Sequence, residues 1–434
     1  MLRTIRILFL LGLLTTACLA SQARAATSTI DVIHATGVIN PVLRDYIERG
    51  IDHAEESDAV ACIIQLDTPG GLDTSMRDIV QDIVNARVPV VVYVSPSGAR
   101  AASAGVFLTV AAHVAAMAPN TAIGAAHPVA ISAEGEEGMS ETMEEKVVND
   151  AAAYIRSLAQ AHGRNMEWAE KAVRESVSAT EQEALELNVI DMVAPNLDTL
   201  ISQLDGRQVT MLDGRVVTLH TEGATINHIM MSTAEDFLYA ISDPNIAYLL
   251  LSLAMLGIMA EISNPGLIFP GVVGAICLIM AFFSLGMLPV NYAGLLLIVL
   301  AFGLFIAEVF TATFGLFTAG GATSLVLGSL ILFKGGPLFQ VNPWLIATVV
   351  IVITAIFAFV ISRIIRAHRR QASTGREELV GKTALVKVAL DPQGMVLFKG
   401  ERWTAEAKEG PVEPGETVTI DRVDSLKLYV TKKQ

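Results

Sequence analysis

The apolar residues of this 434-residue chain follow different patterns in successive regions. Residues 26–235 alternate short apolar runs with amphipathic segments, a pattern typical of strands that alternate with helices. Residues 246–366 are almost without charge, and residues 376–434 return to short alternating runs. We therefore expect a soluble α/β domain, a helical membrane domain and a small all-β domain.

The first region predicts parallel β–α–β units with right-handed crossovers. The expected strands cover residues 29–39, 59–66, 88–94, 110–117 and 121–123. The expected helices cover residues 41–56, 74–86, 141–162, 166–174 and 180–187, and one further helix follows Ser103. Asn40 and Thr180 stand where N-caps belong, and Glu183 completes a capping box with Thr180.

The apolar region predicts about five membrane spans, each near the length that crosses a bilayer. They cover residues 246–261, 267–287, 292–310, 314–333 and 344–365. The fourth is rich in glycine, so it either crosses by close packing or re-enters on one side.

The N-terminal segment and the charges at the end of the last span predict how the protein is oriented in the membrane. Residues 1–25 have the form of a secretory signal peptide, with a basic start, an apolar run and an Ala-Arg-Ala end. The last span ends in four arginines: Arg363, Arg366, Arg369 and Arg370. By the positive-inside rule that end is cytoplasmic. We therefore expect a multi-pass protein of a bacterial inner membrane, with the α/β domain outside, the C-terminal domain inside and an odd number of spans.

Residues 376–434 predict five short strands separated by turns, which suits a small barrel of the OB type. The expected strands cover residues 379–390, 394–398, 401–407, 417–423 and 427–430. Its only aromatic residues are Phe398, Trp403 and Tyr429, and acidic residues offset its lysines. A structural or protein-binding role is therefore favoured over nucleic-acid binding.

Charge and cysteine usage narrow the functional classes. The net charge is −14, from 30 basic and 44 acidic side chains, which argues against nucleic-acid binding. Beyond the leader only Cys62 and Cys277 remain, without the spacing of a disulfide framework or a metal site. No phosphate-binding glycine loop is present, so no cofactor is expected.

Two strand ends carry candidate chemistry. The segment Asp67-Thr-Pro-Gly-Gly71 follows one apolar strand, and Ser103 follows another among small residues. Small neighbours let a carbonyl approach the serine, and glycines let backbone N–H groups face an oxyanion. The alternative is that both segments are ordinary βα turns.

A serine nucleophile needs a base, and two candidates follow it in the chain. Lys146 begins a helix among apolar neighbours, and a lysine serves as a base only where burial lowers its pKa. Its alternative fate is a solvated lysine that faces Asp150 at i+4. His127 follows a strand end and needs no large pKa shift, but it could equally be a structural histidine.

The motifs together resemble the long-form NfeD proteins, membrane-bound serine peptidases related to the Clp protease and the signal-peptide peptidase SppA, in the crotonase superfamily. Asp67–Leu72 resembles the family's oxyanion loop, Ala101–Gly105 its nucleophile motif, and Lys146–Ser157 the helix with the dyad lysine. Residues 176–191 are similar to the closing motif of Clp-type folds, and residues 119–128 to the Clp segment with the triad histidine.

The resemblance implies a Clp/crotonase-like domain over residues 26–235, a transmembrane domain over 246–366 and an OB-type domain over 376–434. It implies an ATP-independent serine endopeptidase with a Ser103–Lys146 dyad and an oxyanion hole made by Gly71 and Ala104. His127 stays as an alternative base or a substrate-positioning residue. The implied partner is a stomatin- or prohibitin-like membrane protein, cleaved in an apolar segment, and a homo-oligomer is implied.

Three other functions stay open from the sequence. The chain could be a membrane scaffold that organises a stomatin-like protein without cleaving it. It could be a crotonase-like acyl-CoA enzyme, although an extracytoplasmic site argues against CoA chemistry. It could be a transporter, although the ionisable residues of the spans, Glu261, Glu308 and Arg363, lie near predicted span ends and give little support for a substrate path across the membrane.

Overall fold

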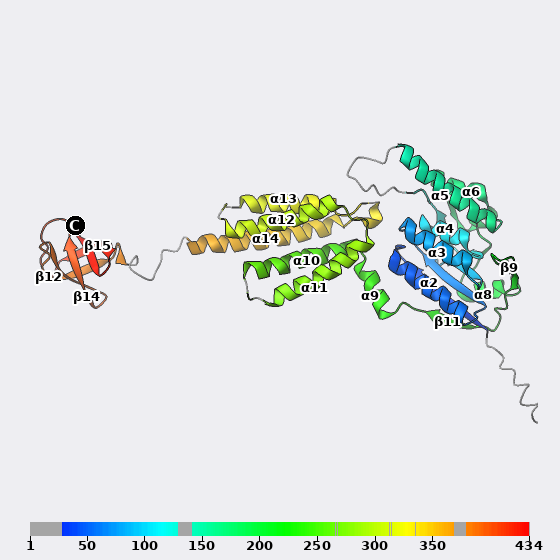
Figure 1. Cartoon of the computed structure of the whole chain (residues 1–434), viewed down its shortest axis with the longest axis horizontal. Coiled ribbons are helices and arrows are strands. Elements are labelled where there is room, and N and C mark those ends of the chain that lie inside the picture. The colour runs from blue at the N-terminus through cyan, green and yellow to red at the C-terminus, as the bar shows by residue number, and fades with distance from the viewer. Residues whose placement is uncertain are drawn as a thin grey trace, which may run out of the picture. The chain divides into compact units, whose positions relative to one another are not determined.

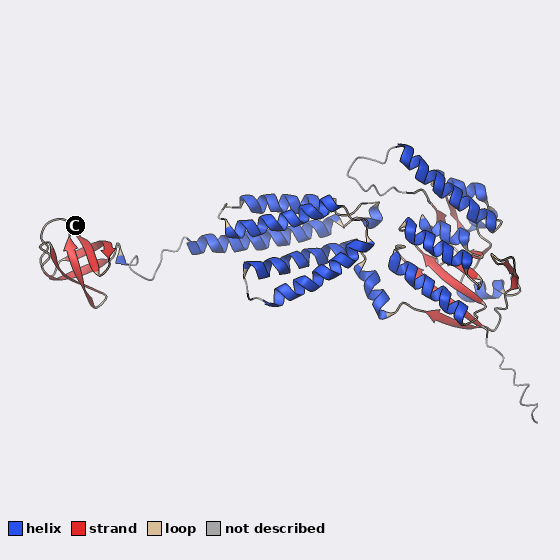
Figure 2. Cartoon of the chain, viewed as in Figure 1, coloured by secondary structure: helices blue, strands red, loops and turns tan. Residues whose placement is uncertain are grey.

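The computed structural model describes residues 28–433 except 129–140, 265, 267, 312, 314, 335 and 369–378. The predicted signal peptide, residues 1–25, therefore lies outside the described residues. Figure 1 colours the chain from its N-terminus to its C-terminus and labels many of the elements, and Figure 2 separates helices from strands. The first region contains β1 (Thr29–Thr36), α2 (Pro41–Glu56), β2 (Ala61–Asp67), α3 (Asp73–Asn85), β3 (Val90–Val94), β4 (Arg100–Ala102), α4 (Ala104–Ala111), β5 (Val114–Met117), β6 (Ala122–Gly124), α5 (Glu141–Ala161), α6 (Met166–Arg174), β7 (Ser178–Thr180), α7 (Glu181–Glu186), β8 (Met192–Val193), α8 (Leu197–Leu204), β9 (Gln208–Thr210), β10 (Val216–Thr218), β11 (Thr225–Ile229) and α9 (Thr233–Ile241).

A parallel sheet in the order β11-β1-β2-β3-β5-β8 is the centre of this region. Its strands are apolar on both sides, and β3 is buried at every position. Residues of α2 to α6 pack on one face of the sheet, and α8 with the β9–β10 hairpin packs on the other. Two covered faces are what a parallel sheet requires, and the expected α/β architecture is confirmed.

A smaller sheet, β4-β6-β7, joins the end of β2. The Thr68 N–H donates to the Arg100 carbonyl at 2.8 Å, and the Ala102 N–H donates to the Thr68 carbonyl at 3.1 Å. The Asp67 carboxylate also accepts the Arg100 N–H at 3.1 Å. These bonds bring the two strand ends with candidate chemistry side by side.

Most expected elements are present, and one is wrong in part. The Asn40 side chain caps α2, and Thr180 with Glu183 forms the predicted capping box on α7. Residues 110–117 were expected to be one strand, but Val110 and Ala111 end α4 and only Val114–Met117 forms β5. An apolar run has no periodicity that separates a buried helix end from a buried strand.

The apolar region contains four described helices that are long and apolar enough to cross a membrane. They are α10 (Pro244–Ser263), α11 (Ile268–Met287), α12 (Tyr292–Phe310) and the Pro343–Val360 part of α14 (Pro343–His368). The fourth predicted span corresponds to α13 (Leu316–Leu330), an apolar helix of 15 residues. This is shorter than the roughly 20 residues that span a bilayer.

Glycines allow close approach of these helices. A Cβ built on Gly274 of α11 would lie 2.8 Å from the backbone nitrogen of Ile258 in α10. A Cβ built on Gly328 of α13 would lie 2.8 Å from the carbonyl oxygen of Gly294 in α12. Such contacts need residues without a side chain, as expected for helices that pack in a membrane.

Glu308 near the end of α12 holds the start of α13. Its buried carboxylate accepts hydrogen bonds from the Gly315 N–H at 2.8 Å, the Thr318 N–H at 3.1 Å and the Thr313 hydroxyl at 2.9 Å. A carboxylate at a helix N-terminus accepts hydrogen bonds from N–H groups that lack partners within the helix, and its negative charge is attracted by the positive end of the helix dipole. The local structure therefore gives this membrane carboxylate a capping role.

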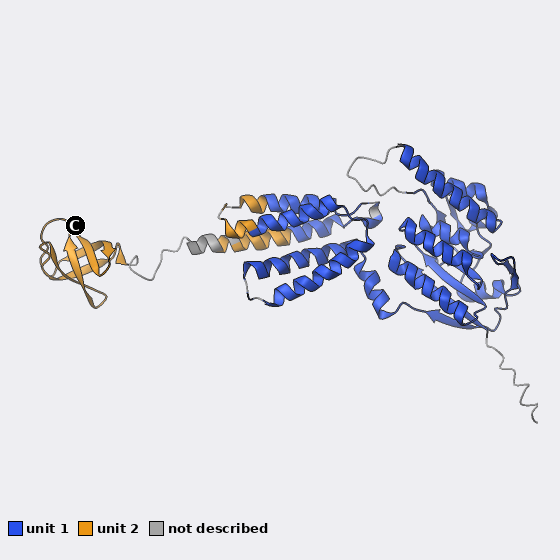
Figure 3. Cartoon of the chain, in the orientation of Figure 1, with its two compact units in different colours: residues 1–306, 320–350 blue, residues 307–319, 351–434 orange. Residues whose placement is uncertain are grey.

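The chain divides into two compact units, Met1–Ile306 with Gly320–Val350, and Ala307–Ala319 with Ile351–Gln434 (Figure 3). The second unit contains a closed five-stranded barrel, in the order β12-β13-β14-β16-β15. Its strands are β12 (Thr383–Val388), β13 (Gln393–Phe398), β14 (Glu401–Ala407), β15 (Thr417–Asp424) and β16 (Lys427–Lys432). The five predicted strands are confirmed.

Candidate active site

Ser103 occupies a strained turn between β4 and α4. Its backbone angles are φ 52° and ψ −115°, a region that residues with a side chain rarely adopt. Its N–H donates to the Gly124 carbonyl at 3.1 Å, which fixes the turn. A serine on a sharp strand-to-helix turn presents its hydroxyl outward, as the nucleophile of α/β-hydrolases does.

The glycine loop after β2 lies directly against this serine. Gly70 has φ +117°, and a Cβ built on it would lie 2.6 Å from the Ser103 Cβ and 3.0 Å from its Oγ. Only glycine fits there, because any side chain would occupy the space of the serine.

The N–H and the carbonyl of Gly71 point away from the neighbouring segment around Ile39, whereas the groups on either side of Gly71 bond to that segment. The Ile39 N–H donates to the Gly70 carbonyl, and the Leu72 N–H donates to the Ile39 carbonyl. Because peptide groups alternate in direction along an extended segment, the Gly71 N–H faces the opposite side. Ala104 is the first residue of α4, where an N–H has no acceptor within the helix. Two backbone donors next to Ser103 could therefore stabilise an oxyanion.

A cavity of about 510 Å³ contains all four predicted site residues, Ser103, Lys146, Gly71 and Ala104. The other lining residues are mostly apolar and come from α3, α4, α5 and the segment before residue 129: Leu72, Met76, Phe107, Ala126, Pro128, Val147 and Ala151. Asp73, Arg77 and Asp150 add charge on one side. An apolar cavity with a few convergent polar groups is typical of a substrate site.

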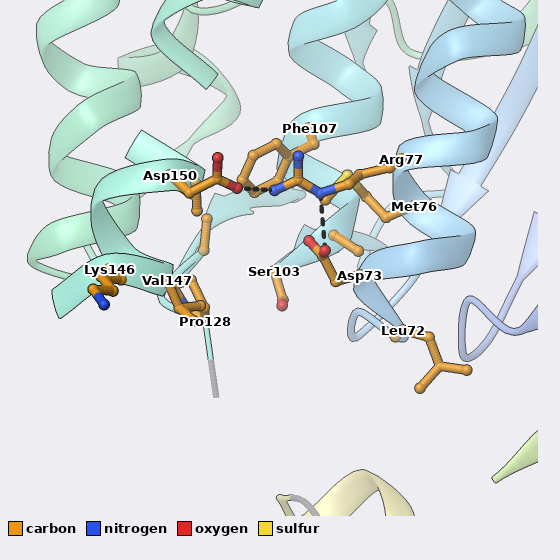
Figure 4. Close-up of a pocket in the computed structure, with 14 residues that line it drawn as sticks. Leu72, Asp73, Met76, Arg77, Ser103, Phe107, Pro128, Lys146, Val147 and Asp150 are labelled. Atoms are coloured by element: carbon orange, nitrogen blue, oxygen red, sulfur yellow. Dashed lines mark hydrogen bonds and ion pairs between the residues drawn. The ribbon is translucent and has the colours of Figure 1, made fainter. Parts of the chain in front are cut away.

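Lys146 shares the cavity but does not contact Ser103 directly. It lies near the start of α5 with an exposed side chain, and Figure 4 shows its amine apart from the serine hydroxyl. No hydrogen bond joins these two described residues. Its neighbour at i+4, Asp150, bonds instead to Arg77, with 2.5 Å between the Arg77 Nη2 and the Asp150 Oδ2.

His127 is held elsewhere. Its Nδ1 lies 2.8 Å from the carbonyl oxygen of Val173, and its Nε2 lies 4.0 Å from Glu144 Oε1. Although Ala126 and Pro128 line the cavity, His127 does not. The described contacts therefore hold His127 outside the lining of the cavity that contains Ser103.

Thr68 is a site residue that the sequence analysis did not single out. It is fully buried, and its hydroxyl donates to the Gly37 carbonyl at 2.7 Å and accepts the Gly70 N–H at 3.0 Å. Its backbone also pairs with β4, so it ties the glycine loop to the serine strand. The only available signal was its place inside the Asp67–Gly71 motif.

Asp191, the last residue of the closing motif, is the centre of a partly buried cluster of ionic groups. Its carboxylate accepts the Ala115 N–H at 2.8 Å and pairs with Arg164 at 2.7 Å and Arg207 at 2.8 Å. His113 and His162 lie nearby, edge to face at 5.8 Å. Burial, together with the Arg164 charge, lowers the pKa of each ring to about 4. These groups stabilise the fold around α4 and β5.

The described residues contain no group of three histidine, cysteine or acidic side chains placed to hold a metal ion.

Three family models match the chain in succession. Residues 29–227 match the NfeD1b N-terminal domain, residues 245–363 the NfeD integral membrane domain, and residues 376–432 the NfeD-like C-terminal, partner-binding domain. The matches follow the order of the three regions described above.

Two curated proteins are similar over almost the whole length. The chain is 38% identical to Membrane-bound protease PH1510 of Pyrococcus horikoshii over 418 residues, 94% of each chain. It is 26% identical to Membrane protein NfeD1b of Bacillus subtilis over 459 residues, 97% of each chain. A solved structure, the 1510-N membrane protease specific for a stomatin homolog from Pyrococcus horikoshii, is 35% identical and covers 50% of this chain and 99% of that chain, with a TM-score of 0.44. With this extent of identity and all three regions matched, the chain belongs to the NfeD family of membrane proteins.

Proposed function

We propose that this protein is a membrane-bound serine endopeptidase that uses Ser103 as nucleophile and Lys146 as general base. One observation carries the proposal: Ser103, in its strained turn, lines the same cavity as Lys146 and as Gly71 and Ala104, the residues whose N–H groups would stabilise an oxyanion. The protease description of the relative from Pyrococcus horikoshii supports the same reaction class.

In this mechanism neutral Lys146 accepts the Ser103 hydroxyl proton while the serine oxygen attacks a peptide carbonyl. The N–H groups of Gly71 and Ala104 stabilise the oxyanion. The C–N bond then breaks, and the Lys146 ammonium gives its proton to the leaving amine. Lys146 then deprotonates a water molecule that attacks the acyl carbon; the bond between this carbon and the Ser103 oxygen breaks, and the proton passes from Lys146 to that oxygen. No step requires ATP.

Lys146 must approach Ser103 for the first step. A substrate that fills the apolar part of the cavity would displace water from around the amine. Loss of water favours the neutral form of a lysine, which is the form that accepts a proton. Apo geometry in which base and nucleophile are separated is compatible with this sequence of events.

The substrate we propose is an apolar segment of a stomatin- or prohibitin-like membrane protein. The mostly apolar lining around Ser103 suits such a segment. The solved relative is described as specific for a stomatin homolog, and the C-terminal barrel matches a partner-binding domain. We place the α/β domain outside the plasma membrane, the barrel in the cytoplasm and the active form in a homo-oligomer.

The test uses the full chain in detergent micelles with apolar peptides tiled from stomatin-like proteins, and cleavage is read by mass spectrometry. Ser103→Ala and Lys146→Ala should abolish cleavage, whereas His127→Ala should keep most of it. Activity that survives in Lys146→Ala and disappears in His127→Ala would assign the base to the histidine. A folded wild-type protein that cleaves nothing would favour a scaffold, with which the exposed Lys146 also agrees.

A further inference from the structure

Arg77 belongs to α3, the helix that follows the glycine loop, and its side chain reaches α5, the helix that carries Lys146. Its Nε donates to Asp73 on α3 at 2.8 Å, and its Nη2 donates to Asp150 on α5 at 2.5 Å (Figure 4). The guanidinium also lies over the ring of Tyr154 on α5, 4.7 Å from its centroid. Tyr154 in turn stacks on Phe107 of α4 at 6.0 Å. One side chain therefore links α3 and α5 beside the cavity.

The link between Arg77 and Asp150 bears on Lys146, because Asp150 could otherwise pair with this lysine. Asp150 is one helical turn beyond Lys146, the spacing at which opposite charges on a helix pair. A carboxylate that paired with Lys146 would hold it as an ammonium ion, which cannot accept a proton. In the structure Asp150 is bonded to Arg77 instead.

We infer that Arg77 is a positioning residue that keeps Asp150 away from Lys146 and so leaves the lysine available as a base. This inference rests on the proposed Ser103–Lys146 mechanism. Arg77 suits the role because its planar guanidinium bonds two carboxylates at once and stays charged at every relevant pH.

Among the described residues, the charged groups near Lys146 on the helices that line the cavity are Glu144, Glu145 and Asp150 on α5, and Asp73 and Arg77 on α3. Before the undescribed segment, His127 lies 4.0 Å from Glu144. The α4 helix carries no charged residue. Asp150 is therefore the cavity-lining carboxylate on the same helix as Lys146.

The experiment measures the rate of Ser103 labelling by a fluorophosphonate against pH, in the full chain in detergent micelles. Arg77→Gln frees Asp150 to pair with Lys146, so the midpoint of the acid limb should move up by about 0.5 unit, the size expected for an exposed ion pair. One pH unit below the midpoint this shift lowers the rate about threefold. Asp150→Asn alone should give no upward shift, and Arg77→Gln/Asp150→Asn should return the midpoint to that of wild type.

Arg156→Gln is the matched control, because Arg156 also links α5 to a neighbouring helix through an ion pair, at 3.0 Å from Glu170. It should leave the midpoint unchanged. Arg77→Lys keeps a positive charge beside Asp150, so its midpoint should stay close to that of wild type. It provides a second test if Arg77→Gln does not fold.

The inference is overturned if Arg77→Gln leaves the midpoint in place, or if the double variant keeps the same shift as the single one. The second result would mean that Arg77 only supports the shape of the cavity. Labelling that persists at the wild-type rate in Lys146→Ala would instead contradict the proposed dyad, whatever the Arg77 variants do.

Discussion

Gly70→Ala tests the proposed nucleophile through its closest neighbour. The new methyl group would lie 2.6 Å from the Ser103 Cβ, whereas carbon atoms in contact prefer about 3.5–4.0 Å. The serine must therefore move by about 1 Å, and a displacement of that size in a catalytic group costs about 100-fold in rate. We expect Ser103 labelling by a fluorophosphonate to fall about 100-fold.

The same substitution has a bounded effect on stability. Alanine at φ +117° costs about 1–2 kcal/mol of backbone strain, and the crowded contact adds about 1–3 kcal/mol. A typical domain has about 5–15 kcal/mol of stability, so the variant should fold with a lower Tm.

Gly98→Ala is the matched control for this prediction. Gly98 also has a positive φ, +92°, but a Cβ there meets nothing within 4 Å. It should show a comparable strain cost and label at nearly the wild-type rate. The reasoning is refuted if Gly70→Ala labels within threefold of wild type, or if Gly98→Ala loses as much activity as Gly70→Ala.

Three further predictions follow from the buried polar groups. Thr68→Val removes the hydroxyl that holds the glycine loop, so we expect a loss of about 1–3 kcal/mol in unfolding free energy and at least tenfold slower labelling of Ser103. The control is Thr121→Val, which also removes a buried, hydrogen-bonded hydroxyl and should lower only Tm. His113 and His162 have a pKa near 4 in the folded chain and 6.5 when unfolded, so both rings bind protons more weakly in the folded protein. The unfolding free energy should therefore be highest above pH 6.5 and should level off below pH 4. Between these values it should fall by about 3 kcal/mol for each ring that titrates independently. Denaturant unfolding of His113→Asn/His162→Asn should lack most of that decline, and an unchanged decline would contradict the assignment. Glu308→Gln puts an amide donor against N–H groups and should lower Tm in detergent, while an unchanged Tm would argue against its capping role.

The parts of the fold that the sequence predicts are those with local signals. β2, before the glycine loop, and β3, the apolar strand upstream of Ser103, are mostly apolar runs followed by small residues, so the sequence predicts both strands and the two candidate segments that follow them. The five barrel strands are separated by Gly and Pro turns, and each was found within a few residues. By contrast β4 and β7 have three residues each, too few for a period to be recognised.

Site residues that act through distant partners could not be predicted. Thr68 bonds a carbonyl 31 residues away, and Arg77 bonds Asp150 across 73 residues. The i+4 rule predicted that Asp150 would face Lys146, and tertiary structure gives Asp150 a different partner. The fourth apolar helix was predicted, as a span over residues 314–333, but its cap was not, because Glu308 precedes its first residue by eight positions.

The most direct test of the central claim is to locate the residue that a fluorophosphonate modifies in the full-length protein. Digestion and peptide mapping by mass spectrometry should place one adduct on Ser103, and the Ser103→Ala protein should acquire none there or elsewhere. Labelling should be competed by the apolar peptide that the enzyme cleaves. An adduct on another serine, or cleavage that persists in folded Ser103→Ala, would contradict the assignment of Ser103 as the nucleophile.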